Sequence, residues 1–206
     1  MAENGIIVDI PQNLENLQLP SSELLNYYNM RDERILYIDF EIDMTILEIQ
    51  REIITFNLED RDIPIEQRKP IKLLIDTNGG NLIESMSLVS IIQMSKTPVW
   101  TINIGSALSG GALILLAGHK RFALSYSVAM IHTGNGGFEG TYEQVEAQQK
   151  MYKRLVEKML EYIKEKTTIE KGIFSRNKAK DWYIDSSEQL KYGFVDEIID
   201  NIFDYL

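Results

Sequence analysis

VWTINIGSALSGGALILLAG, residues 99–118, runs from an apolar strand pattern through a glycine-flanked turn into an apolar helix pattern. The turn holds Ser109. A strand-to-helix turn of this kind exposes a serine hydroxyl, and the first N–H groups of the helix remain free to stabilise an oxyanion. Small residues at such a turn also serve packing and capping. The stretch therefore indicates a candidate nucleophile at Ser109 that needs a base elsewhere in the chain.

The same alternation of strand and helix repeats on both sides of this stretch. A capping box at Thr45 and Glu48 is predicted to open the first helix. Strand patterns occupy 34–42, 71–76, 99–104 and 122–131, and helical patterns occupy 46–56, 82–94 and 110–116. Such alternation predicts an α/β fold with right-handed crossovers and a largely parallel sheet.

Three candidate site elements follow predicted strands directly. They are the turn at Gly79 and Gly80, the turn at Ser109, and His132. Active sites of parallel α/β sheets lie at the carboxyl ends of the strands. We therefore expect the three elements to line one pocket.

A second capping box, Thr141-Tyr-Glu-Gln144, opens a helix that continues to about Lys166. The helix is long for so small a domain, and it carries an apolar stripe at Val145, Tyr152, Leu155, Met159 and Ile163. We expect this stripe to pack against another subunit. Residues 1–33 are predicted to form an N-terminal arm, and residues 34–206 a single domain.

Composition excludes several functional classes. The 206-residue chain has a net charge of −10, which argues against nucleic acid or an anionic membrane as a partner. It contains no cysteine, no apolar stretch of membrane-spanning length and no secretory signal pattern at its start, so a cytoplasmic protein is expected. The glycine-rich segment 134–140 lacks the spacing of a nucleotide loop, and the two histidines and scattered acids show no metal-site spacing.

The base and its orienting acid must come from few candidates. His132 follows a strand pattern, whereas His119 lies in a turn that is expected at the surface. A catalytic imidazole needs a third group to fix its tautomer. The sequence leaves four carboxylates open for this role: Asp76, Asp181, Asp185 and Asp196.

Five motifs, taken in order from about residue 34 to the end, resemble the ClpP-like serine peptidases, the proteolytic subunits of the ATP-dependent Clp protease. They are Asp76-Thr-Asn-Gly-Gly80, Gly105-Ser-Ala-Leu-Ser109-Gly-Gly-Ala, Met130-Ile-His132, Gly136-Gly-Phe-Glu-Gly140, and Lys180-Asp181 followed by Tyr192-Gly-Phe-Val-Asp196. The chain departs from the usual family pattern at Asn78, at Thr133-Gly134, and at Leu108 and Gly110 beside the serine.

The resemblance implies a ClpP/crotonase-like spiral of βα units with a long protruding handle helix at about 142–166. It implies Ser109 as nucleophile, His132 as base and Asp181 as orienting acid, with the amides of Gly80 and Gly110 as oxyanion hole. Gly79, Gly136, Gly137 and Phe138 would bind substrate.

At the level of the assembly, the resemblance implies a peptidase acting on unfolded polypeptides without metal or cofactor. Two stacked heptameric rings would enclose the sites, and an AAA+ unfoldase is a possible partner.

Two other functions stay open: a catalytically impaired ring subunit that assists an active relative, and an acyl-CoA enzyme of the crotonase type. A hydrogen bond between Ser109 and His132, with Asp181 at the other imidazole nitrogen, would favour the active peptidase.

Overall fold

The computed structural model describes residues 21–177 and 180–206. The first twenty residues of the predicted arm lie outside this range. Within the rest of the arm, α1 (Ser22–Asp32) is a helix whose N-cap, Ser21, accepts a hydrogen bond from the Leu24 amide. Arg31 at its end pairs with Glu52 and Glu59 of the next helix. These contacts join α1 to the body of the protein.

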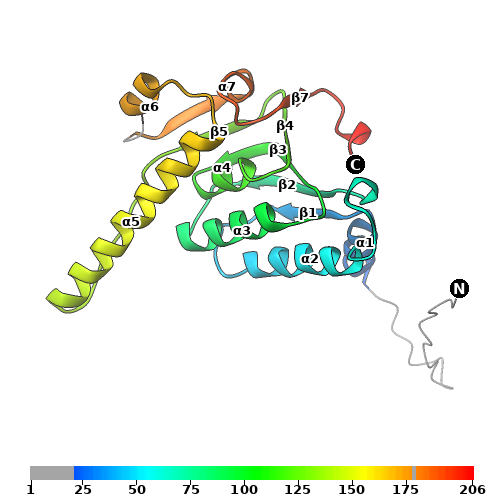
Figure 1. Ribbon diagram of the computed structural model, residues 1–206, viewed down its shortest axis with the longest axis horizontal. Coiled ribbons are helices and arrows are strands. Elements are labelled where there is room, and N and C mark those ends of the chain that lie inside the picture. The colour runs from blue at the N-terminus through cyan, green and yellow to red at the C-terminus, as the bar shows by residue number, and fades with distance from the viewer. Residues whose placement is uncertain (1–20, 178–179) are drawn as a thin grey trace, which may run out of the picture.

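A seven-stranded sheet forms the centre of the molecule (Figure 1). Its main path runs β1-β2-β3-β4-β7, all parallel, while β5 pairs with β3 in parallel and with β6 in antiparallel orientation. The strands are β1 (Ile35–Ile38), β2 (Ile71–Thr77), β3 (Val99–Leu108), β4 (Lys120–Leu124), β5 (Val128–Ile131), β6 (Trp182–Asp185) and β7 (Glu197–Ile199). The predicted α/β class with a mostly parallel sheet is confirmed.

Helices α2 (Ile46–Glu59) and α3 (Leu82–Met94) lie side by side along the sheet in Figure 1. Ile46, Ile49, Ile53 and Phe56 recur at helical spacing along α2, and all four are buried. The other helical segments are α4 (Gly110–Leu115), α5 (Tyr142–Lys166), α6 (Lys171–Asn177), α7 (Ser186–Lys191), η2 (Ile65–Gln67) and η3 (Ile202–Asp204). In the described part of the chain, every helix is too short or too polar to cross a lipid bilayer.

The structure corrects two details of the predicted elements. Thr45 does not cap α2 through its side chain, because its hydroxyl and amide both donate to the Asp43 carboxylate. This local bond competes with the capping box. The predicted strand 122–131 is divided into β4 and β5, because the chain turns at Ser125 and Tyr126, where the Ser127 amide donates to the Leu124 carbonyl.

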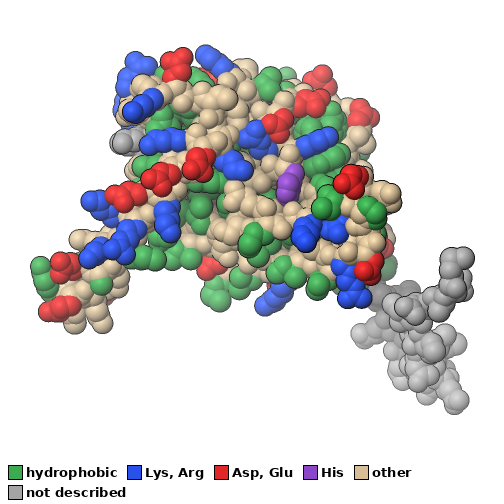
Figure 2. Space-filling view, in the orientation of Figure 1, with side chains coloured by type: hydrophobic (Ala, Val, Ile, Leu, Met, Phe, Trp, Pro, Cys, Tyr) green, Lys and Arg blue, Asp and Glu red, His purple; other side chains and the backbone are tan. Residues whose placement is uncertain are grey.

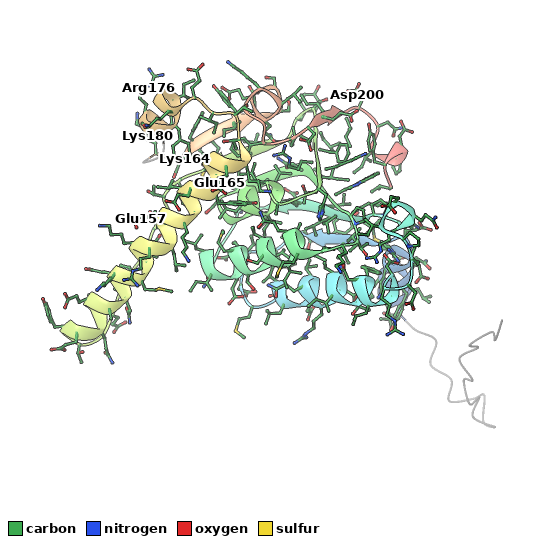
Figure 3. All side chains as sticks on the ribbon, viewed as in Figure 1. Glu157, Lys164, Glu165, Arg176, Lys180 and Asp200 are labelled. Carbon is green, nitrogen blue, oxygen red and sulfur yellow. The ribbon has the colours of Figure 1, made fainter. Side chains whose placement is uncertain are left out.

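Helix α5 projects away from the sheet, and only its C-terminal end joins the core (Figure 1). Its buried residues are Met159, Tyr162 and Ile163. Two residues of the predicted apolar stripe, Met159 and Ile163, therefore pack in the core of this chain and not against another subunit. The Tyr162 hydroxyl donates to the Leu113 carbonyl at 3.1 Å, and burial raises the pKa of this phenol. Charged side chains of both signs line the visible side of the projecting helix (Figure 2). Figure 3 shows three of them, Glu157, Lys164 and Glu165.

Candidate active site

Ser109 lies at the sharp turn between β3 and α4. Its backbone has φ 53° and ψ −115°, a conformation that non-glycine residues rarely adopt. The turn is fixed by the Ser109 amide, which donates to the Met130 carbonyl at 2.7 Å, and by the Ser109 carbonyl, which accepts from the Ala112 amide. Strained backbone of this kind persists only where the surroundings enforce it and is concentrated at functional sites.

His132 and Asp181 are brought together by strand register. In the antiparallel pair of β5 and β6, Ile131 lies opposite Trp182. His132 follows Ile131 and Asp181 precedes Trp182, so the two side chains come from neighbouring positions at the same end of the pair. This proximity depends on antiparallel pairing between segments that are far apart in sequence.

The three side chains form one hydrogen-bonded chain. Ser109 Oγ lies 2.8 Å from His132 Nε2, and His132 Nδ1 lies 3.0 Å from Asp181 Oδ1. The His132 side chain is 18% exposed and the Asp181 side chain is 61% exposed, so the imidazole is sheltered while the carboxylate faces solvent. The arrangement suits proton transfer from the serine hydroxyl to an imidazole whose tautomer the carboxylate fixes.

The remaining aspartates that the sequence left open have other partners. Asp76 accepts a hydrogen bond from the Ser106 amide at 2.8 Å. Asp185 caps α7, and hydrogen bonds from Ser187 and from the Glu188 amide hold the pKa of its carboxyl below the ordinary value. Asp196 pairs with Arg121. Of the four carboxylates, Asp181 is the one that reaches the His132 ring.

His119 is exposed, as expected for its turn, and its Nδ1 accepts a hydrogen bond from the Val99 amide at 3.0 Å. Desolvation lowers the pKa of this imidazole. This hydrogen bond places His119 beside Val99, the first residue of β3. Ser109 follows the last residue of the same strand, so His119 lies at the opposite end from the serine.

The glycine turn after β2 lies against the serine turn. Gly79 has φ +94°, and a Cβ at this position would come within 2.6 Å of the Leu108 carbonyl and 2.7 Å of Ser109 Cβ. Only glycine therefore fits there. The next residue, Gly80, stands in a parallel bridge with Ile42, in which the hydrogen bonds use the Gly79 carbonyl and the Asn81 amide.

This pattern leaves the Gly80 amide unused in the bridge. Gly110 is the first residue of α4, where backbone N–H groups have no partner within the helix. Among the described residues, no recorded hydrogen bond uses the amide of Gly80 or of Gly110. Two free donors therefore flank the Ser109 turn, an arrangement suited to stabilising a developing oxyanion.

Gly110 is buried, which explains the absence of a side chain beside the serine. A Cβ here would lie 2.2 Å from Ser85 Oγ and 3.3 Å from Ile42 Cδ1. Ser85 and Ile42 are themselves fully buried. The departure at Gly110 is thus matched by close packing from α3 and from the segment after β1.

An open groove of about 970 Å³ runs past these residues. It contains all of the expected substrate-binding residues, and apolar side chains of α5 form part of its lining. The expected residues are Gly79, Gly136, Gly137 and Phe138. The sequence did not identify Tyr152 as a support for the glycine segment. Its ring packs against Phe138 with centroids 5.7 Å apart, and its hydroxyl donates to the Thr133 carbonyl.

The described residues hold no group of three or more metal-ligating side chains suited to a metal ion. The groups that line the groove include hydroxyl, imidazole, carboxylate, side-chain amide and backbone amide groups beside apolar surface.

Sequence similarity links the chain to a known protein family. Residues 21–202 match the family model described as Clp protease. The chain is also similar to the ATP-dependent Clp protease proteolytic subunit of Deinococcus radiodurans, with 33% identity over 132 residues. This alignment covers 63% of the present chain and 65% of that relative, so the chain spans just under two thirds of the relative's length. Because the family model matches nearly all of the described residues, the chain belongs to the Clp protease family.

Proposed function

We propose that the protein is a serine endopeptidase in which Ser109 is the nucleophile, His132 the general base and Asp181 the orienting acid. The observation that carries the proposal is the hydrogen-bonded chain from Ser109 Oγ through the two imidazole nitrogens to Asp181 Oδ1. The strained backbone at Ser109 supports it, since nucleophilic serines are presented on turns of this kind.

In the proposed reaction, Ser109 Oγ attacks the peptide carbonyl carbon while His132 Nε2 takes the hydroxyl proton. The amides of Gly80 and Gly110 donate to the oxyanion of the tetrahedral intermediate. The proton on Nε2 then passes to the leaving amine, and an acyl-enzyme forms on Ser109. Water, deprotonated by His132, releases the acid product and restores the hydroxyl. Asp181 stabilises the imidazolium in both halves of the reaction.

The glycine segment would hold an extended substrate by strand addition. Gly136 and Gly137 are exposed, and among the described residues no recorded hydrogen bond uses their backbone groups. Free N–H and C=O groups on extended chain pair readily with a peptide backbone. Such pairing recognises the backbone of the substrate and not its side chains, which suits unfolded polypeptides as substrates.

The projecting helix supports a ring assembly. Tyr142 and Met151 of α5 are 77% and 54% exposed, although both are large apolar side chains. We propose that α5 is the handle that packs between two stacked heptameric rings, so that the groove faces an enclosed chamber. A Clp-type AAA+ unfoldase would then deliver substrate to the chamber at the expense of ATP, and the complex would be cytoplasmic.

The aligned side chains support an active peptidase over an impaired assisting subunit. An acyl-CoA enzyme would share the paired oxyanion donors but would not need the serine, imidazole and carboxylate in one chain of hydrogen bonds.

Fluorophosphonate labelling tests the assignment directly. The reagent should modify Ser109 in the wild-type protein, and Ser109→Ala should abolish both labelling and peptide hydrolysis. Ser90→Ala is the matched control, since Ser90 is an exposed serine of α3 whose hydroxyl donates to the Met86 carbonyl. Robust hydrolysis by Ser109→Ala would contradict the assignment.

A further inference from the structure

Strand β3 changes partner just before the Ser109 turn. Its first half pairs with β4 from Trp100 to Asn103, and Asn103 lies opposite Ala123. Its second half pairs with β5 from Ser106, which lies opposite Val128. On the other side of β3, the register with β2 shifts over the same residues. The sheet therefore forks between the β4 and β5 branches at this point.

Two buried amide side chains fill the fork. Asn103 Nδ2 donates to the Val128 carbonyl at 3.1 Å and to Gln189 Oε1 at 3.0 Å. Gln189 Nε2 donates to the Ser127 carbonyl at 3.1 Å and to the Ile184 carbonyl at 3.3 Å. Both side chains are fully buried. The pair thus joins β3 and β6 to the start of β5.

These strands carry the three residues of the candidate active site. Ser109 follows β3, His132 follows β5 and Asp181 precedes β6. A change in the spacing of the strands at the fork would therefore alter the spacing of the three side chains.

The pair is not explained by stability alone. Among the described residues, Asn103 Oδ1 and Ser127 Oγ are buried without a hydrogen-bond partner. A buried acceptor without a partner is unfavourable, and the pair retains one at Asn103 Oδ1. The amides instead provide directional bonds between strands, which an aliphatic pair could not.

We propose that Asn103 and Gln189 are positioning residues of the active site. They set the spacing of β3, β5 and β6, and through it the alignment of Ser109, His132 and Asp181. The inference deepens the proposed function and rests on it. A displacement of about 1 Å in reacting groups lowers the rate by about a hundredfold, so small changes at the fork are measurable as activity.

The test compares Gln189→Met with Gln50→Met in the full-length assembled protein. Both substitutions replace a buried amide by an apolar side chain of similar length. Gln50 of α2 is 8% exposed and donates to Ser87 Oγ, so it is a matched control that contacts none of the three strands through that bond. A double variant, Asn103→Leu with Gln189→Met, removes both partners of the fork bond at once.

In Gln189→Met, labelling of Ser109 by fluorophosphonate and kcat for a short peptide should fall about tenfold or more, with KM changed less than about twofold. Gln50→Met should keep the wild-type values. The double variant should fold, with an equally low labelling rate. Amide hydrogen exchange in 128–132 and 180–185 should be faster in Gln189→Met and unchanged in Gln50→Met.

A folded Gln189→Met that keeps its labelling rate within about twofold would overturn the positioning role. Equal losses in Gln50→Met, or failure of both fork variants to fold, would do the same and would indicate a structural role only. A wild-type protein that is not labelled would contradict the proposed function instead. In that case unchanged hydrogen exchange in Gln189→Met would separately overturn the effect on strand spacing.

Discussion

The serine turn and the outer half of α5 are held in place by different means. Around Ser109, other segments of the same chain approach so closely that Gly79 and Gly110 have no room for a side chain. Along α5, the residues from Tyr142 to Met151 are almost all exposed, and the helix start is held by the capping box of Thr141 and Gln144. The comparison indicates that the site is held by close contacts within the chain, whereas the outer surface of the long helix is exposed in the single chain.

The largest expected effect is at the imidazole. His132→Ala should lower kcat/KM for a short peptide by about ten-thousandfold with the fold retained, because the serine loses its base. Fluorogenic peptide hydrolysis and circular dichroism measure the two quantities. His119→Ala is the control and should retain activity within about threefold. Similar losses in the two variants would show that the comparison between the two histidines is mistaken.

The next effect tests the close packing of the turn. Gly110→Ala should destabilise the protein by about 1–3 kcal/mol, because the new Cβ meets Ser85 Oγ. Chemical denaturation measures the change. Adding Ser85→Ala removes that hydroxyl and should recover part of the loss. A Gly110→Ala protein as stable as wild type would mean that the turn has more room than its contacts imply.

Tyr152 lies between the two regions, since it belongs to α5 and packs against the glycine segment. Tyr152→Ala should raise KM for peptides about tenfold, because Phe138 and its segment lose their support. Steady-state kinetics should show a much smaller effect for Tyr152→Phe, which keeps the ring and loses only the 3.4 Å bond to Thr133. Equal effects of the two substitutions would shift the role from the ring to the hydroxyl.

The smallest effect on the single chain is expected at the outer end of α5. Tyr142→Ser should change the free energy of unfolding of the unassembled chain by less than about 0.5 kcal/mol, because the side chain is exposed. Analytical ultracentrifugation should nevertheless detect weaker assembly. Glu143→Ser, on the adjacent position, is the control. Unchanged assembly in Tyr142→Ser would argue against an apolar contact at this site.

Local pattern predicted much of the fold because each signal lies within a few residues. The strand-to-helix units, the turn at Ser109 and the helix from Tyr142 to Lys166 all carry their own periodicity or caps. The division between β4 and β5 was missed because the run 122–131 contains neither glycine nor proline. Helix α1 was not predicted either, and its fixed position depends on contacts of Arg31 with α2.

The choice of acid could not be made from the residues alone. Asp76, Asp181, Asp185 and Asp196 look alike until the register of β5 and β6 places one of them beside His132. The fork residues Asn103 and Gln189 were missed for the same reason, since their partners are distant in sequence. Resemblance to a family supplied the acid, but gave no indication of the amide pair.

The order of residues along the chain makes the bond between His132 and Asp181 the closure of a loop. All of α5 and α6 lies in the chain between these two residues, and the pairing of β5 with β6 fixes the loop's ends. The entropy of loop closure grows only with the logarithm of loop length, by about 0.6 kcal/mol for each doubling. The projecting helix can therefore be lengthened or shortened at its outer end with little thermodynamic cost to the geometry at its base.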